Sequence, residues 1–200
     1  MAARGEELSR ALDALGVAPD VRSSLEKWLR LLEEWNQRID LTAARTEGEL
    51  CDLMLADAAQ LAAHVPHGAR VVDVGAGAGA PGLALALMRP DLAMTLVEPL
   101  AKRAAFLRTV LGNVGRVDVA ILRERGEAVA GRSPRGFDVA VSRATLAPPA
   151  WIPLGLALAP AAWALLAKEP PPEIPGARID VEICYTWPAT GAERRAVRYV

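Results

Sequence analysis

The sequence predicts an α/β protein in which an N-terminal helical extension, residues 1–66, precedes a domain, residues 67–200, built on a mostly parallel seven-stranded sheet. Apolar side chains recur at helical spacing in the extension. After Arg70 the pattern changes to short apolar runs that alternate with helical stretches, which is typical of a parallel sheet covered by helices. Two final runs around Gly191 predict a closing β-hairpin. A chain of 200 residues with 52% hydrophobic content is long enough to bury a sizeable core.

The extension is expected to contain three helices. The first covers residues 6–15 and ends at a glycine, and the second begins near Pro19. The third begins at Thr46, which matches a capping box with Glu49, and continues towards residue 66. The second helix is marked by Leu25, Trp28, Leu29, Leu32, Trp35 and Ile39. We assign the tryptophans to the core rather than to base-stacking platforms.

Five short apolar runs are expected to form the parallel part of the sheet. They are Val71–Val74, Ala93–Val97, Val117–Leu122, Val139–Ser142 and Trp163–Ala167. The hairpin is expected in residues 178–187 and 193–200, after a proline-rich turn.

An uncharged segment at residues 144–167 is long enough to span a bilayer. Its four prolines remove amide donors and free carbonyl groups that hydrocarbon cannot satisfy. We therefore expect a buried helix around Pro153–Leu158, then a strand, and no membrane association.

Charge and cysteine content restrict the functional class. The net charge is −1, but residues 1–66 hold seven Lys/Arg against twelve Asp/Glu, whereas residues 102–143 hold nine against four. This distribution predicts a local basic surface rather than a generally basic protein. Cys51 and Cys184 lack metal-ligand spacing, so we expect two reduced, buried thiols and no metal. The charged N-terminus does not resemble a secretory signal, and a cytoplasmic location is expected.

The segment "VVDVGAGAGAPG", residues 71–82, predicts a ligand-binding turn. Asp73 ends the first strand, and Pro81 can start a helix without losing a hydrogen bond. Between them, three glycines allow a sharp turn and bring bare backbone against a ligand: Gly75, Gly77 and Gly79. The second strand ends at Glu98, where a carboxylate can accept both hydroxyls of a ribose. An adenosine-type cofactor is therefore expected.

Two cofactors compete for this turn, because residues 77–82 also fit the dinucleotide pattern G-x-G-x-x-G. A dinucleotide brings phosphates and usually needs a second half-domain, whereas S-adenosylmethionine brings a sulfonium and an ammonium group. Asp73 suits the two cations, and a single α/β unit with a hairpin after the fifth strand favours S-adenosylmethionine. An NAD-binding oxidoreductase is the alternative.

Several motifs then resemble one family, the bacterial small-subunit rRNA guanine-N7 methyltransferases known as RsmG or GidB. The segments "DVGAGAGAPGLALAL" and "LVEPLAKRAAFL" resemble that family's cofactor site. In order along the chain, "WNQRIDLTA", "RGE", "FDVAVSRA", "LLAKE" and "ERRAVRYV" are similar to its other motifs. The resemblance covers the chain almost from end to end.

The resemblance implies a Rossmann-like class I methyltransferase that uses S-adenosylmethionine, without a metal, to methylate N7 of a guanine in the 530 loop of 16S rRNA. It implies 16S rRNA or the small ribosomal subunit as partner, and we expect a monomer. Carried over to this chain, the cofactor site comprises Asp73, Gly75, Ala76, Gly77, Gly79, Ala80, Glu98, Glu127 and Arg143. The catalytic candidates are Arg143 and Arg125, each following a strand; Lys168, Lys102 and Arg103 are weaker candidates.

Guanine N7 has a free lone pair and carries no proton, so the implied transfer needs no general base. His64 and His67 are accordingly interpreted as surface or capping residues. The enzyme must instead align the two reactants in a dry, shaped pocket.

The chain departs from the family pattern at positions expected to flank the RNA. The family usually has Asn at Asp40, histidine at Leu53, Ser or Thr at Ala76, Phe at Ala80 and Gly at Glu169. A divergent paralogue with another substrate, or an RNA-binding module without turnover, is therefore kept as an alternative.

Overall fold

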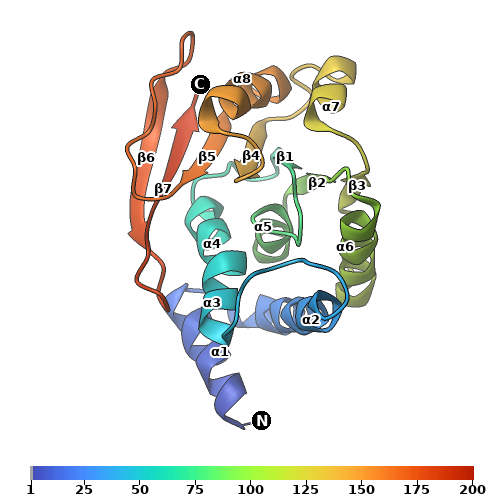
Figure 1. Ribbon diagram of the computed structural model, residues 1–200. Coiled ribbons are helices and arrows are strands. Elements are labelled where there is room, and N and C mark those ends of the chain that lie inside the picture. Colours follow the sequence, from blue (N-terminus) through green and yellow to red (C-terminus); the bar gives the residue numbers. More distant parts are fainter. Residues whose placement is uncertain (1) are drawn as a thin grey trace.

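The computed structural model describes residues 2–200 and consists of one seven-stranded sheet with helices on both faces (Figure 1). The strand order is β3-β2-β1-β4-β5-β7-β6; the first five are parallel, and β7 is antiparallel to both β5 and β6. The strands are β1 (Arg70–Val74), β2 (Ala93–Val97), β3 (Ala120–Leu122), β4 (Val139–Arg143), β5 (Ala162–Leu166), β6 (Ile179–Thr186) and β7 (Glu193–Tyr199). The predicted fold class is confirmed.

The helices fall into an N-terminal group and four that follow strands. The first group is α1 (Ala2–Ala14), α2 (Pro19–Asn36), α3 (Glu47–Cys51), the π-helical turn η1 (Asp52–Ala56) and α4 (Asp57–Ala62). The second is α5 (Gly82–Met88), α6 (Ala101–Val114), α7 (Gly126–Arg132) and α8 (Pro148–Leu158). In Figure 1, α7 and α8 lie on one side of the sheet, and the N-terminal group lies on the other with α5 and α6.

Each face of the sheet has its own hydrophobic core. Because successive side chains of a strand point to opposite faces, Val71 belongs to the core with α2 and α5, whereas Val72 packs against α8. Trp28 is fully buried in the first core. The extension therefore shares its core with the sheet, and the division at residue 66 stays a prediction.

Some boundaries differ from those expected. Helix α8 begins at Pro148, five residues before the predicted start, because prolines in a first helical turn lose no helical hydrogen bond. Strand β3 begins at Ala120 rather than at Val117, because Val117 is 84% exposed and does not pack in the core. The third predicted helix is interrupted by η1, a feature without a signal in apolar spacing.

The capping box at the start of α3 forms in part. The Thr46 hydroxyl accepts a hydrogen bond from the Glu49 amide at 3.1 Å, as predicted. The Glu49 carboxylate accepts from the amide of Arg45, at 2.8 Å, rather than from that of Thr46.

Candidate functional site

A cavity of about 500 Å³ opens at the carboxyl ends of β1, β2 and β4. This edge, next to the strand where the chain order reverses, is where open α/β sheets bind ligands. The lining residues are Leu41, Met54, Gly75, Ala76, Gly77, Ala78, Ala80, Glu98, Pro99, Leu100, Arg103, Arg125, Arg143, Ala144 and Thr145. Most of the predicted site residues therefore lie around one cavity.

The glycine turn is built from backbone with φ values that other residues rarely adopt. Gly75 has φ +79° and Gly77 has φ +56°. A β-carbon on Gly75 would lie 2.0 Å from the Thr145 hydroxyl oxygen, whereas one on Gly77 would meet only a carbonyl oxygen at 3.8 Å. Gly75 is thus required by the packing of the protein, and Gly77 leaves open space beside the cavity.

Glu98 fastens this turn from the end of β2. Its side chain accepts a hydrogen bond from the Gly77 amide at 2.9 Å and another from the Leu100 amide at 2.8 Å. The residue is 2% exposed but lines the cavity. Because a carboxylate oxygen can accept more than one hydrogen bond, both oxygens retain capacity for ligand hydroxyls.

Asp73 lies beneath the turn and is fully buried. One carboxylate oxygen, Oδ2, accepts from the Gly82 amide at 2.8 Å, while Oδ1 accepts no hydrogen bond from the residues that the structure describes. Burial raises the pKa of Asp73 to about 7, against the lowering influence of the Gly82 amide and of Arg143. The open acceptor suits a ligand that brings a donor or a positive charge, although Asp73 is outside the cavity lining.

The N-terminal extension supports the same turn. Trp28 of α2 donates from Nε1 to the Ala78 carbonyl at 3.1 Å. Asn36, in the "WN" motif, accepts from the amides of Leu41 and Thr42 at 2.8 and 3.0 Å. These bonds shape the loop that brings Leu41 to the cavity, so the motif has a structural role that sequence reasoning missed.

Arg143 ends β4 and lines the cavity with a side chain that is 19% exposed. Its Nη1 atom donates to the Asp57 carboxylate at 3.1 Å and to the Leu53 carbonyl. Next to it, Ala144 has φ +54°, a left-handed conformation that is strained for alanine and clusters at functional sites. No sequence signal marked Asp57 as the partner of Arg143.

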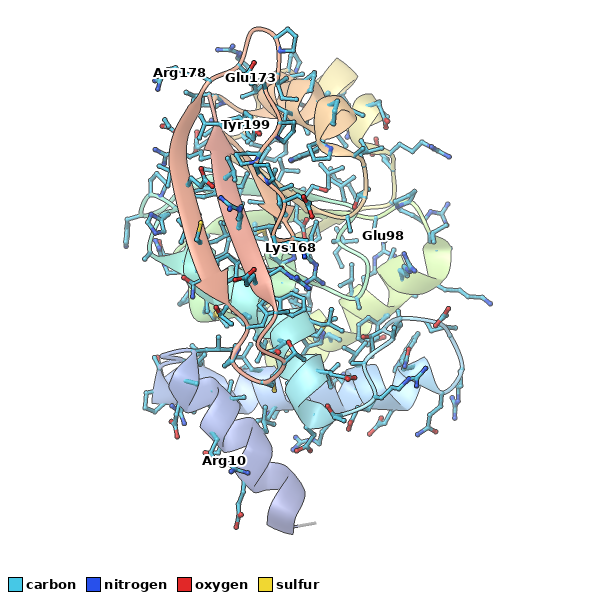
Figure 2. The ribbon with its side chains drawn as sticks, turned by 60° about the vertical axis from the view of Figure 1, so that its left-hand side comes forward. Arg10, Glu98, Lys168, Glu173, Arg178 and Tyr199 are labelled. Carbon is cyan, nitrogen blue, oxygen red and sulfur yellow. The ribbon has the colours of Figure 1, made fainter. Side chains whose placement is uncertain are left out.

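The remaining candidates are less closely tied to the cavity. Arg125 lines it as the N-cap of α7 but is exposed, whereas Glu127 is exposed in the first turn of α7 and outside the lining. Gly79 also lies outside the lining. Lys168 lines a separate hollow beside β6 and β7; Figure 2 shows it with Glu98 in the middle of the molecule, away from Tyr199. The cofactor and catalytic roles of these residues stay predictions.

His64 and His67 are exposed, which confirms their surface position. Cys51 is buried as expected, whereas Cys184 is exposed on β6, so the expectation of two buried thiols is wrong for Cys184. Within residues 2–200, no group of three or more His, Cys, Asp or Glu side chains could hold a metal ion. Among the helices described, none has the length and apolar character needed to cross a membrane.

Comparison with known proteins gives consistent relatives. The profile of the GidB family, described as rRNA small subunit methyltransferase G, matches residues 21–150. A ribosomal RNA small subunit methyltransferase G from Anaeromyxobacter dehalogenans strain 2CP-C is 38% identical over 157 residues, which cover 77% of this chain and 73% of that protein. Another from Nocardioides sp. is 44% identical over 66% of this chain and 51% of that protein.

Solved structures share the fold at low sequence identity. TrmN from Thermus thermophilus has a TM-score of 0.54 with 18% identity, covering 75% of this chain and 48% of its own. Precorrin-6y C5,15-methyltransferase from Geobacter metallireducens has a TM-score of 0.51 with 10% identity, covering 72% of this chain and 86% of its own.

Proposed function

The chain belongs to the GidB family, rRNA small subunit methyltransferase G, and from this premise we propose that it methylates N7 of a guanine in the 530 loop of 16S rRNA. The proposed methyl donor is S-adenosylmethionine. The observation that carries the proposal is one cavity that unites the glycine turn and Glu98 with Arg125 and Arg143. The proposal is supported because the glycine turn and Glu98, which suit an adenosine cofactor, line the same cavity as two arginines, which suit RNA.

The residues present fit S-adenosylmethionine. Glu98 retains acceptor capacity for the ribose hydroxyls, and Gly77 leaves room for a close approach to the backbone. The buried Asp73 has an unsatisfied oxygen next to the turn, which fits a cationic ligand. When bound, the cofactor would supply an electrophilic methyl group on sulfur.

The charged residues of the lining fit an attack by guanine N7. They are Glu98, Arg103, Arg125 and Arg143. Since N7 carries no proton, the chain need not supply a base, and Glu98 is already engaged with two amides. We assign Arg143 and Arg125 to contacts with the RNA, and we assign to Arg143, which Asp57 anchors, the alignment of N7 with the methyl group, an effect that can supply several kcal/mol.

The deciding experiment measures tritium transfer from labelled S-adenosylmethionine to small-subunit RNA and to assembled subunits from a strain that lacks the gene. We expect label in 16S rRNA, released as 7-methylguanine after digestion. RNA retention without label would instead indicate a binding module, and label in another RNA would indicate a divergent paralogue.

Calorimetry provides an independent check of the cofactor. We expect binding of S-adenosylmethionine and its demethylated product, and none of NAD. Tight NAD binding without S-adenosylmethionine binding would replace the proposal with the oxidoreductase alternative.

A further inference from the structure

The guanidinium group of Arg143 is hydrogen-bonded to the described residues through one of its three nitrogens. Within residues 2–200, its hydrogen bonds all come from Nη1, which donates to Asp57 and to the Leu53 carbonyl. Its Nε and Nη2 donors are thereby left for a ligand, and the residue lines the cavity. An arginine fixed at one nitrogen presents its other donors in a defined direction, because the guanidinium is planar.

Asp57, the anion that holds Arg143, is itself fixed by the C-terminal hairpin. Its Oδ2 atom accepts from Arg143 at 3.1 Å, whereas Oδ1 accepts from the Tyr185 hydroxyl at 2.7 Å and from Trp187 Nε1 at 3.0 Å. The Asp57 residue is 2% exposed. Its buried charge is therefore compensated by one cation and two neutral donors.

The two neutral donors stay protonated at any physiological pH. Burial and the negative charge of Asp57 hold the pKa of Tyr185 well above its ordinary value, and an indole N–H does not titrate in this range. Oδ1 therefore always has its partners, and Oδ2 remains directed at Arg143.

The π-helical turn contributes the second acceptor. Segment η1, Asp52–Ala56, directly precedes Asp57, and the carbonyl within it that receives Arg143 is that of Leu53. A π-turn widens a helix locally and is frequent at functional sites. The irregular turn and the residue that follows it thus supply the two groups that hold the arginine.

We propose that Asp57 is the positioning residue of Arg143, and that Tyr185 and Trp187 orient Asp57, so that the C-terminal hairpin sets the direction of an active-site arginine. This inference rests on the proposed function, in which Arg143 contacts the RNA.

The first test removes one contact at a time and measures methyl transfer. In Asp57→Asn, the amide can still accept from the hairpin but turns an NH₂ group towards Arg143, so two donors face each other. We expect kcat to fall at least tenfold, with KM for RNA and the cofactor Kd within threefold. Tyr185→Phe removes one donor and should lower kcat about threefold.

Tyr199→Phe is the matched control. Tyr199 lies on the neighbouring strand β7, and its hydroxyl donates to the Pro172 carbonyl at 2.9 Å, far from Glu98 and Lys168 in Figure 2. This variant loses the same atom and one hydrogen bond, and its kcat should stay within 1.5-fold of the parent value. An equal fall in Tyr185→Phe and Tyr199→Phe would overturn the proposal.

A double-mutant cycle separates positioning from general stability. If Asp57 acts through Arg143, Asp57→Asn and Tyr185→Phe should each lower kcat less than twofold in an Arg143→Ala background. Equal losses in both backgrounds would overturn the proposal. Should Asp57→Asn not fold, Tyr185→Phe in the same two backgrounds gives the decision.

A second readout does not depend on catalysis. Exchange of the Nη1 protons of Arg143, followed by NMR and assigned by their absence in Arg143→Lys, should be slow in the parent and in Tyr199→Phe. We expect at least tenfold faster exchange in Asp57→Asn, and unchanged exchange would overturn the proposal. If the parent transfers no methyl group, the proposed function fails, but this measurement still tests whether Asp57 holds Arg143 in place.

Discussion

The two sides of the cavity are built in different ways. On the cofactor side, the carboxylates of Asp73 and Glu98 accept from backbone amides that are at most 21 residues away along the chain. On the arginine side, Arg143 is held by Asp57, 86 residues away, and Asp57 by Tyr185, 128 residues away. The hydrogen bonds of these two acids therefore follow from a short motif and the strand end after it, although Trp28 and Thr145 pack against the same turn. The arginine side depends on how distant elements pack.

The largest expected effect breaks the cofactor side through its packing. Gly75→Ala places a β-carbon 2.0 Å from the Thr145 hydroxyl oxygen at a φ of +79°, so strain and overlap act together. We expect a loss of about 4 to 5 kcal/mol in the free energy of unfolding, measured with urea.

Gly77→Ala is the matched control, because its β-carbon would have open space. Only the positive φ then costs stability, about 1 to 2 kcal/mol, while cofactor affinity should fall at least tenfold because the methyl group occupies ligand space. Equal stability losses in the two variants would show that Thr145 yields easily and that the turn is softer than its geometry indicates.

The second effect concerns the buried acid on the same side. Because the pKa of Asp73 is about 7 in the folded protein and near 3.8 when exposed, the folded state retains this proton longer. Stability from this group is highest below pH 4, falls as the pH rises to 7 and then levels off, by up to about 4 kcal/mol in total.

Asp73→Asn tests this pH dependence, since an amide keeps the bond to Gly82 without titrating. The variant's stability relative to the parent should rise between pH 4 and 8, measured by urea unfolding in identical buffers. The difference cancels the titration of groups that do not interact with Asp73. A constant difference would place the pKa of Asp73 near its ordinary value.

The contrast also explains what could be predicted from the sequence. Periodicity and the glycine turn predicted the strands, the closing hairpin and the position of Glu98, because these depend on residues close in the chain. The Asp57 cluster could not be predicted: it joins three distant segments, and η1 has no pattern in apolar spacing. Glu127 was predicted from a resemblance, and the structure places it outside the cavity lining.

The third effect tests the ribose contact. Glu98→Ala should weaken binding of S-adenosylmethionine by about 1.5 to 3 kcal/mol in calorimetry, the scale of a lost hydrogen bond to a charged group. Glu98→Gln keeps one acceptor but turns its NH₂ group towards one of the two backbone amides that Glu98 binds, so its loss should be similar. Unchanged affinity in both would place the adenosine elsewhere, and Glu127→Ala in the same assay tests whether that residue contributes.

The smallest expected effects compare the two arginines on the opposite side. Arg143→Ala should leave cofactor affinity within threefold, below about 0.7 kcal/mol, and slow methyl transfer at least tenfold, above about 1.4 kcal/mol.

Arg125→Ala should follow the same pattern more weakly, because Arg125 is exposed, whereas Arg143 is anchored by Asp57. Replacing an arginine that contacts phosphate should lower RNA affinity and reduce the salt dependence of RNA binding by about one ion. Replacing an arginine that holds an extruded guanine should instead lower turnover and leave that salt dependence unchanged. We expect the turnover effect for Arg143 and the salt effect for Arg125, because only an anchored side chain can align a reacting base. Parent rates in both variants would remove these residues from the site and point to a different substrate, as the departures at Asp40, Leu53 and Ala80 would then indicate.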